Sequence, residues 1–368
     1  MRTLLVTGGA GFIGGNFVLR SLAQDDNLRI INLDALTSAG NMDTLSSLQD
    51  NARHVFVHGD IGDAATVSDI FEEYAPDGVV NFAAESHVDR SIDGPGAFVQ
   101  TNIVGTLNML QCSLDWWKTR AEDKQSAFRF LHVSTDEVYG SLGATGLFRE
   151  TTQYAPNSPY AASKAGSDHL VRAFHHTYGM PVLTTNCSNN YGPYQFPEKL
   201  IPLIIQNALD MKPLPVYGDG QQVRDWLFVL DHVDAINTVL NEGRPGQVYN
   251  VGGMAERTNM QVVEAICDAL DARRPDPGFG SRRQLITHVA DRPGHDRRYA
   301  MDGSKLAALG WAPSVPFEDG LPATVAWYRE HPEWVASARS GDWHGYYERQ
   351  YGARLAAGRA VDQQGEAG

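Results

Sequence analysis

The sequence predicts an α/β protein with a doubly wound parallel sheet and a smaller C-terminal α/β lobe that binds the substrate. Three observations support this prediction. Short β-rich runs alternate with segments of helical periodicity over the first half of the chain, as expected for a parallel sheet covered by helices on both faces. A glycine-rich turn joins the first of these runs to the first helical segment. The length of 368 residues leaves room for a second lobe.

The expected elements follow one another in a regular order. We expect strands at residues 3–7, 28–33, 54–58, 78–82, 128–133 and 181–186. We expect helices at residues 12–23, 64–74, 97–118 and 159–178. Because crossover connections between parallel strands are right-handed, the doubly wound order is the default topology.

The glycine-rich turn runs from Gly8 to Gly14 and fits the pattern G-x-G-x-x-G. Glycines let the backbone approach a pyrophosphate, whose charge is met by the amides at the start of the following helix. Asp34 closes the second strand, where a carboxylate can accept hydrogen bonds from both ribose hydroxyls and would repel a 2′-phosphate. We therefore expect NAD rather than NADP, although a purely structural turn is the alternative. Asp60, after the third strand, could bond the adenine or cap the next helix.

The composition changes after about residue 187, where prolines and aromatic residues become dense. We expect residues 1–187 to form an NAD-binding Rossmann domain, to which a segment around 221–250 returns. Residues 188–350 are expected to form mainly a substrate-binding lobe, with short strands at 248–251 and 285–289 within or beside it. Residues 351–368 are rich in Ala, Gly, Gln and charge, and we expect a flexible tail there.

The overall composition, with 42% hydrophobic and 20% charged residues, is that of an ordinary soluble protein. A net charge of −14 argues against nucleic acid or an anionic membrane as partner. The three cysteines have no metal-ligand spacing, so we expect no metal site and a reduced cytoplasmic location. No apolar run reaches the length of a membrane span, and the N-terminus is typical of a first strand rather than a signal peptide.

Tyr160 and Lys164 lie one helical turn apart on the expected helix 159–178. An ammonium group near a phenol favours phenolate, so we expect Lys164 to lower the pKa of Tyr160. The phenolate could then take a hydroxyl proton while a hydride leaves the carbon. The alternative is an exposed helical pair without function.

Thr135, Asp136 and Glu137 follow the expected fifth strand. Helix capping alone would explain such a group. Consecutive residues of a strand point to opposite faces, so both carboxylates can reach one ligand only if the strand has already ended. The carboxyl ends of the strands are where ligands bind in α/β sheets. The pair predicts an acid and a base for chemistry beyond oxidation, namely elimination of water.

Several motifs together carry a resemblance to a known family. They are residues 7–14 (TGGAGFIG), 83–89 (AAESHVD), 134–140 (STDEVYG), Tyr160 with Lys164, 186–193 (NCSNNYGP), 196–200 (FPEKL), 224–226 (RDW) and 291–299 (DRPGHDRRY). With these motifs the chain resembles the extended short-chain dehydrogenase/reductases, and within them the dTDP-glucose 4,6-dehydratase family. The resemblance extends from residue 1 to about 330, and the Thr-Asp-Glu triplet is its most discriminating part.

The resemblance implies a specific reaction on dTDP-glucose that yields dTDP-4-keto-6-deoxyglucose. Thr135 would bond the sugar at O4 and Tyr160 would remove the O4 proton while NAD takes hydride from C4. The ketone acidifies the C5 proton, which Glu137 would remove, and Asp136 would assist loss of the C6 hydroxyl. Hydride then returns to C6, so NAD acts as a tightly held catalyst.

The resemblance also implies which residues contact each ligand. Cofactor contacts are expected from Gly8, Gly11, Phe12, Ile13, Gly14, Asp34, Asp60, Ile61, Ala83, Ala84, Thr101, Tyr160, Lys164 and Asn190. Substrate contacts are expected from Ser86, Thr135, Asn189, Glu198, Lys199, Leu200, Arg224, Asn259, Arg292, His295 and Tyr299. A diphosphate needs local cations in an acidic protein, and arginine suits phosphate best. Surface ion pairs are the alternative for each of these cations, including Arg297 and Arg298. Tyr299 could stack on the thymine.

Other members of the same class remain as alternatives at this point. A 4-epimerase needs only the tyrosine and lysine, so the carboxylate pair argues against it. A UDP-glucuronate decarboxylase or a dehydratase for GDP-mannose or CDP-glucose would share the scaffold, and a non-catalytic NAD sensor would be expected to lack Tyr160, Lys164 or Glu137. Relatives pair helices such as 97–118 and 159–178 between subunits, so we expect a homodimer.

Overall fold

The structure, a computed structural model, describes residues 1–273, 275–340, 343–352 and 354–356. A seven-stranded sheet forms the centre of the N-terminal half, with the strand order β10-β6-β5-β4-β1-β2-β3. Its strands are β1 (Arg2–Thr7), β2 (Leu28–Asp34), β3 (His54–His58), β4 (Gly78–Asn81), β5 (Arg129–Thr135), β6 (Val182–Cys187) and β10 (Val248–Val251). Every pairing within it is parallel, which confirms the expected doubly wound sheet.

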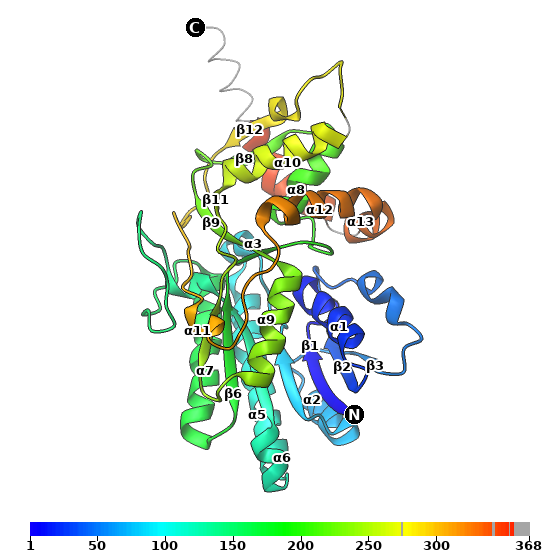
Figure 1. The fold of residues 1–368 in the computed structure, drawn as a ribbon, viewed down its shortest axis with the longest axis vertical. Coiled ribbons are helices and arrows are strands. Elements are labelled where there is room, and N and C mark those ends of the chain that lie inside the picture. Colours follow the sequence, from blue (N-terminus) through cyan, green and yellow to red (C-terminus); the bar gives the residue numbers. More distant parts are fainter. Residues whose placement is uncertain (274, 341–342, 353, 357–368) are drawn as a thin grey trace.

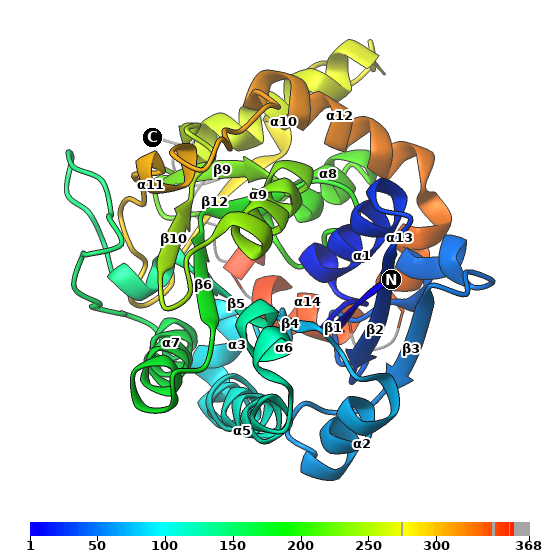
Figure 2. The same cartoon turned by 60° about the horizontal axis from the view of Figure 1, so that its bottom comes forward.

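Helices cover both faces of this sheet (Figures 1 and 2). One face is covered by α1 (Phe12–Gln24) and α9 (Val229–Glu242), which pack against each other. The other face is covered by α2 (Ala64–Tyr74), α5 (Thr106–Lys118) and α7 (Pro159–Tyr178). The central strands read as continuous apolar runs because both of their faces are buried.

The expected helix 97–118 is interrupted in the structure. It begins as α4 (Pro95–Phe98), continues as a π-helical turn, η2 (Val99–Gly105), and only then becomes α5. Asn102 in the π turn donates hydrogen bonds to the Glu85 carbonyl and the Ser163 hydroxyl and accepts one from the Glu85 amide. These buried bonds tie the turn to the loop after β4 and to α7, and π turns often occur at functional sites for this reason.

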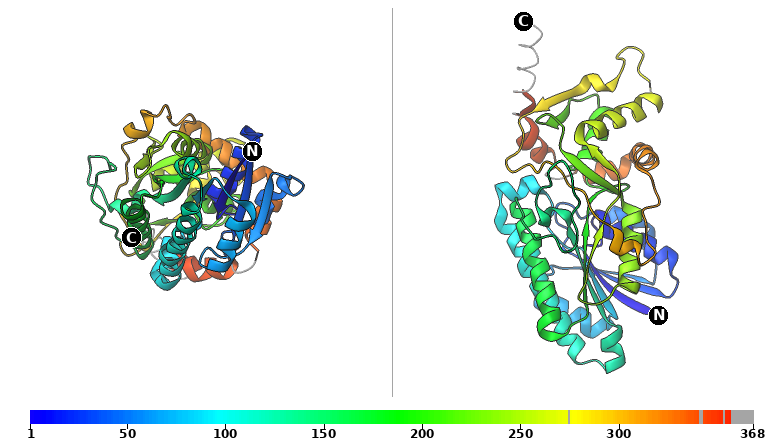
Figure 3. Two further views of the ribbon diagram at one scale, coloured as in Figure 1. Left: turned by 90° about the horizontal axis from the view of Figure 1, so that it is seen from below. Right: turned by 60° about the vertical axis from the view of Figure 1, so that its left-hand side comes forward.

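The second lobe contains two small sheets. One has the order β11-β9-β7, with β7 (Asn189–Tyr191), β9 (Val223–Phe228) and β11 (Glu256–Thr258), and the other pairs β8 (Leu214–Tyr217) with β12 (Ile286–Val289). Around them pack α8 (Leu200–Leu209), α10 (Asn259–Arg273), α12 (Phe317–Glu330) and α13 (Pro332–Ala338), which form one hydrophobic cluster. The right-hand view of Figure 3 shows this lobe above the carboxyl ends of the central strands.

Shorter elements complete the described chain. They are η1 (Met42–Leu48), α3 (Val88–Asp93), α6 (Glu122–Ala127), η3 (Asp136–Tyr139), η4 (Arg282–Leu285), α11 (Ser304–Ala307), α14 (Trp343–Tyr347) and η5 (Glu348–Gly352). No helix within the described ranges is long and apolar enough to cross a membrane.

Residues 248–251 pair with β6 in the central sheet, so the chain returns to this sheet along α9, in the segment around 221–250 for which a return was expected. Two other expectations differ from the structure. The fifth strand ends at Thr135, two residues later than expected. The expected tail does not begin at residue 351, since Tyr351 and Leu355 are buried against Leu203 and Val289; residues 357–368 lie outside the described part.

Candidate functional site

A cleft opens at the carboxyl ends of the central strands, between the sheet and the second lobe. Most of the predicted site residues line it. They are Gly8, Gly11, Phe12, Ile13, Gly14, Asp34, Asp60, Ile61, Ala83, Ala84, Ser86, Thr101, Thr135, Asp136, Glu137, Tyr160, Lys164, Asn189, Asn190, Glu198 and Lys199. The cleft lining does not include Leu200, Arg224, Asn259, Arg292, His295 or Tyr299. Residues that were not among the predicted site residues also line the cleft, including Thr37, Gly40 and Cys187.

The glycine turn has the close backbone approach that a pyrophosphate requires. Gly8 has a φ of +70°, and a Cβ there would lie 2.8 Å from the Ala83 nitrogen. A Cβ on Gly14 would lie 2.2 Å from the Gly8 carbonyl oxygen. Side chains are thus excluded on both sides of the first turn of α1, and the helix N-terminus with its free amides faces the cleft. These residues fit a dinucleotide.

Asp34 and Asp60 have distinct local partners. The Asp34 carboxylate accepts hydrogen bonds from the Ala10 and Leu36 amides, each 2.8 Å long, and so holds the glycine turn against β2. Burial raises the pKa of Asp34, and these two bonds partly offset it. Asp60 accepts from the Gly62 amide at 2.6 Å, whereas α2 is capped by Asp63. Of the two expectations for Asp60, helix capping is therefore wrong.

Tyr160 and Lys164 lie on the buried face of α7, which Ser158 caps. The Lys164 ammonium donates to the Val133 carbonyl at 2.8 Å and lies 3.4 Å from the His132 ring. Burial lowers the pKa of Lys164, and the nearby Asp168 carboxylate raises it. The lysine is therefore anchored to β5 rather than to the phenol.

The expected lowering of the Tyr160 pKa is absent from this structure. Burial raises the pKa of the phenol well above its usual value, and the charge of Glu137 adds to this. The nearby Thr135 hydroxyl acts in the opposite direction. The expectation was wrong because it considered the lysine without the burial of the phenol.

The carboxylate pair follows the end of β5, as its proposed chemistry requires. Thr135 is the last residue of the strand and caps η3, because its hydroxyl accepts from the Glu137 amide at 3.3 Å. The chain then turns, so Asp136 and Glu137 no longer alternate across a sheet. Asp136 is only 2% exposed and Glu137 is partly exposed. The Oδ2 atom of Asp136 is buried without a hydrogen-bond partner among the described residues.

The environments of the two carboxyl groups differ. Burial and the charge of Glu137 raise the pKa of Asp136 well above its usual value. Burial also raises the pKa of Glu137, but Arg292, Arg224 and Lys199 lower it. Asp136 is thus suited to remain protonated and Glu137 to become a carboxylate. Such a split is what an acid and a base in one site require.

The cations of the second lobe are held by specific partners. Arg224 donates to the Asp296 carbonyl at 2.9 Å and lies over the Tyr299 ring, 4.2 Å from its centroid. Tyr299 is 2% exposed and donates to the Asp296 carboxylate, so its ring has no open face for thymine. The Lys199 ammonium donates to the Ser86 carbonyl at 2.7 Å, and Arg90 pairs with Glu198.

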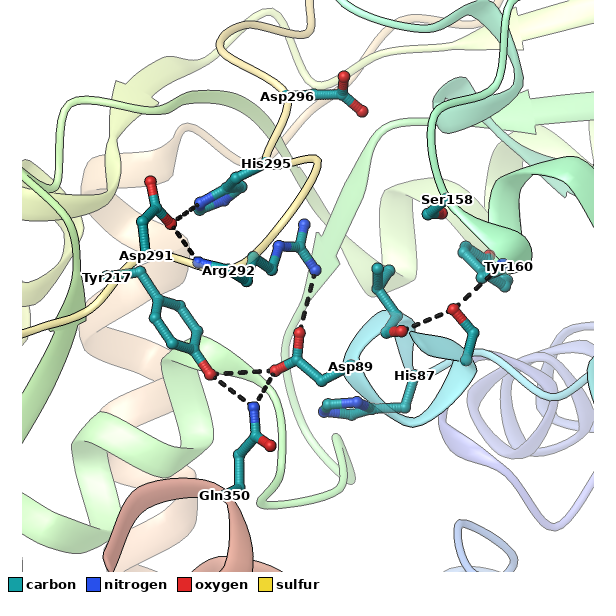
Figure 4. Close-up of polar contacts among 12 residues, drawn as sticks. His87, Asp89, Ser158, Tyr160, Tyr217, Asp291, Arg292, His295, Asp296 and Gln350 are labelled. Atoms are coloured by element: carbon teal, nitrogen blue, oxygen red, sulfur yellow. Dashed lines mark hydrogen bonds and ion pairs between the residues drawn. The ribbon is translucent and has the colours of Figure 1, made fainter. Parts of the chain in front are cut away.

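Arg292 pairs with Asp89, whose carboxylate is also bound by residues from two further segments (Figure 4). Its guanidinium lies 3.4 Å from an Asp89 oxygen, and the other Asp89 oxygen accepts from Tyr217 at 3.0 Å and Gln350 at 2.7 Å. His295 pairs with Asp291 at 2.6 Å, and burial lowers its pKa to about 4. Gln350 carries no sequence signal, whereas Asp89 lies in one of the recognised motifs. Neither was among the predicted site residues.

The remaining predicted residues have simple positions. Arg297 pairs with Asp219 and Arg298 with Glu256, so surface ion pairs, the alternative reading, describe both. Asn190 accepts from His232, and the Oδ1 atom of Asn189 is buried without a partner among the described residues. Leu200 begins α8 and Asn259 begins α10.

Taken with the glycine turn and the Tyr160/Lys164 pair, the fold defines a nicotinamide-dependent oxidoreductase of the extended short-chain dehydrogenase/reductase class. A family model described as GDP-mannose 4,6 dehydratase matches residues 5–324. A dTDP-glucose 4,6-dehydratase of Xanthomonas campestris pv. campestris is 64% identical over 344 residues, which covers 93% of this chain and 97% of the relative. The chain therefore belongs to the dTDP-glucose 4,6-dehydratase family within that class.

Solved structures agree with this assignment. A crystal structure of dTDP-glucose 4,6-dehydratase from Bacillus anthracis in complex with NAD is 45% identical, with a TM-score of 0.81 over 92% of this chain and 100% of that one. A double mutant of the Streptomyces venezuelae enzyme with NAD bound is 47% identical, with a TM-score of 0.84 and the same coverage.

Proposed function

We propose that this protein removes water from dTDP-glucose and yields dTDP-4-keto-6-deoxyglucose, as an NAD-dependent hydro-lyase. One observation carries the proposal: Asp136 and Glu137 lie directly after β5, in the same cleft as Tyr160. Oxidation of an alcohol needs only the tyrosine and lysine. The carboxyl pair adds the acid and the base that elimination needs.

NAD would be held by the glycine turn, Asp34 and the residues around Ala83, which together form a cradle open to the cleft. When bound, it accepts hydride from C4 of the sugar and returns it at C6. We assign the binding of NAD to residues 1–187 together with the segment around 221–250. We assign the binding of the sugar nucleotide mainly to residues 188–350. Arg292, Arg224 and Lys199 are the cations proposed for the diphosphate.

The protein itself moves the protons. Tyr160 takes the O4 proton as a phenolate while Thr135 holds that oxygen; burial opposes this form by raising the pKa of Tyr160, and the positive charges of Lys164 and of oxidised NAD would favour it. The resulting ketone makes the C5 proton acidic, so a carboxylate is a sufficient base for it. Glu137 is assigned this role because the neighbouring cations offset part of the rise that burial causes in its pKa, whereas nothing comparable offsets the rise at Asp136. Asp136, whose pKa is raised by burial and by the charge of Glu137, gives its proton to the departing C6 hydroxyl.

A panel of nucleotide sugars, incubated with the purified protein and followed by mass spectrometry, tests the proposal. We expect loss of one water from dTDP-glucose without net consumption of NAD. Retention of the full mass with dTDP-glucose would exclude the proposed reaction, and a change of configuration at C4 alone would indicate an epimerase.

The roles of the two carboxyl groups can be tested separately. The substitution Glu137→Gln should slow elimination by about 10²–10⁴-fold and leave the reduction of bound NAD by dTDP-glucose nearly unchanged. Tyr160 and Lys164 are untouched by it. If the variant also fails to reduce NAD, Glu137 does not act as the C5 base alone.

We propose that the protein is a homodimer. Val99, Val104 and Leu107 on η2 and α5 are 40–48% exposed, and Tyr178 at the end of the neighbouring α7 is 45% exposed. Such a group of exposed apolar side chains favours burial against a second copy. Sedimentation velocity should give the mass of two chains, and a single-chain mass at micromolar concentration would refute the dimer.

We further propose a cytoplasmic location. Cys112, Cys187 and Cys267 are all free, and Cys187 lies in the cleft, where a reducing compartment keeps it as a thiol. Cell fractionation followed by immunoblotting should recover the protein in the cytosolic fraction. Recovery in a membrane or secreted fraction would contradict this location.

A further inference from the structure

One wall of the cofactor cradle is a loop that follows β2. The loop covers residues 35–41, and Ala35, Thr37, Ala39 and Gly40 in it line the cleft. It continues without a break into η1, which therefore fixes one of its two ends. Contacts that hold η1 in place also hold this wall of the cradle.

On one side, this segment lies against the glycine turn and the start of α1. The Asn41 amide donates to the Ala10 carbonyl at 2.9 Å. The methyl group of Thr44 packs so closely on Gly15 that a Cβ on this glycine would lie 2.7 Å from it. A displacement of Thr44 would therefore open the contact between η1 and the turn that fits a pyrophosphate.

On the other side, the same segment is bound by α13 of the second lobe. The Trp334 indole N–H donates to the Thr44 hydroxyl at 3.0 Å, across 290 residues of sequence. Both side chains are buried. The Asn41 side chain donates to the Ser337 hydroxyl at 3.4 Å. η1 is thus held between the glycine turn and the second lobe.

Trp334 is fixed in its direction by other aromatic side chains. Its ring centroid lies 5.3 Å from that of Trp327, 5.6 Å from that of Tyr194 and 6.4 Å from that of Tyr328. The Tyr328 hydroxyl donates to the carbonyl of Gln195, which also lines the cleft. The aromatic cluster therefore presents the indole donor to η1 and contacts the cleft at a second point.

We propose that Trp334 is a positioning residue for NAD: through Thr44 it holds η1 and the loop 35–41 closed against the glycine turn. The cradle itself comes from the first half of the chain, and the second lobe sets how long the cofactor stays in it. A weaker closure increases the fraction of time for which the loop is open, so loss of the Trp334–Thr44 bond should speed the release of NAD. The inference requires NAD binding alone and does not depend on the reaction proposed above.

The test compares the release of NAD from the wild type, Trp334→Phe, Thr44→Val and the double variant. Phenylalanine keeps an aromatic ring without the N–H, and valine keeps a methyl group for Gly15 without the hydroxyl. Protein loaded with isotopically labelled NAD is mixed with excess unlabelled NAD, and the retained label is counted after rapid filtration. Loss of one hydrogen bond should make each single variant release NAD about two-fold to ten-fold faster. The double variant should release it no faster than the faster single variant, because both substitutions remove the same bond.

Trp117→Phe is the matched control. The Trp117 indole N–H donates to the Gln125 carbonyl at 2.9 Å, between α5 and α6, and neither residue lines the cleft. The control should therefore lose a comparable bond and still release NAD at the wild-type rate.

The outcomes are distinct. Release from Trp334→Phe and Thr44→Val at the rate of Trp117→Phe overturns the proposal, whether that rate is normal or increased. Multiplication of the two single effects in the double variant also overturns it, because the two side chains then act separately. No dTDP-glucose is present in this assay. A protein that releases NAD as expected but removes no water from dTDP-glucose would contradict only the proposed function.

Discussion

The two walls of the cleft are built in different ways. The wall formed by the central sheet takes its reactive groups from two short segments, residues 135–137 after β5 and Tyr160 with Lys164 on α7. The second lobe carries Arg292 outside the cleft lining. Arg292 pairs with Asp89, whose carboxylate also accepts from Tyr217 and Gln350, and these residues are far apart in the sequence. The comparison indicates that the groups proposed for the chemistry are placed by local structure, whereas the arginine proposed for the diphosphate is placed by long-range contacts.

The largest expected effect comes from the sheet wall, where removal of one atom, the Tyr160 hydroxyl oxygen, should abolish most of the activity. The substitution Tyr160→Phe should reduce both the reduction of bound NAD and the loss of water by at least about 10³-fold, because it removes the group proposed to take the O4 proton. Stopped-flow absorbance and mass spectrometry measure the two steps. The exposed Tyr178→Phe is the matched control and should behave as wild type. Normal NAD reduction in the Tyr160 variant would contradict the assignment.

Substitutions in the second lobe should affect mainly the binding of the sugar nucleotide. The substitution Arg292→Met removes a charge-assisted contact worth about 1.5–3 kcal/mol, so KM should rise about ten-fold to a hundred-fold, with a smaller change in kcat. Arg292 also lowers the pKa of Glu137. Without it that pKa rises, and the acidic limb of the pH profile should move to higher pH. Initial rates over pH measure both effects, and Arg297→Met, at an exposed arginine, serves as the control. A loss in kcat alone would place Arg292 in the chemistry instead.

Loss of the hydrogen bond between Gln350 and Asp89 should have a smaller effect on KM than loss of Arg292. Gln350→Ala removes one hydrogen bond to Asp89, worth about 0.5–1.5 kcal/mol, so KM should rise about two-fold to ten-fold at unchanged NAD reduction under saturation. Titration with dTDP by calorimetry should show a rise in its dissociation constant of the same order. A fall in kcat as large as that of Tyr160→Phe would contradict the claim that Gln350 affects substrate binding alone.

The smallest expected effect concerns stability. Burial raises the pKa of Asp136 in the folded protein above its value in the unfolded chain. The folded state then binds more protons between these two pKa values, so this group costs stability as pH rises through that window. Asp136→Asn should therefore raise Tm by about 1–2 °C at neutral pH and by less near pH 4. Calorimetry at both pH values measures it, and a larger gain at pH 4 would contradict the sign.

The sequence was sufficient for the features that depend on local spacing. The glycine turn, Asp34 at the end of β2, and the convergence of residues 135–137 follow from strand ends and helical turns. The later end of β5 did not matter, because Asp136 and Glu137 still lie beyond it. These features need no knowledge of distant residues.

Other features required the folded chain. Lys164 was expected to act on the phenol, but its ammonium bonds the Val133 carbonyl, a partner that spacing along a helix cannot reveal. Tyr299 was expected to offer a face to the thymine, but Arg224 covers it. Gln350 lies near an expected tail, and only the tertiary structure brings it to Asp89.

The Asp89–Gln350 contact spans 261 residues of sequence and so has a consequence for folding. Contacts of long sequence separation cost the most loop-closure entropy and form late. The residues of the sheet wall come from the first half of the chain. The proposed binding site for the sugar nucleotide is complete only when the segment that carries Gln350 has packed against Asp89. A refolding chain should gain affinity for the dinucleotide before it gains affinity for its substrate.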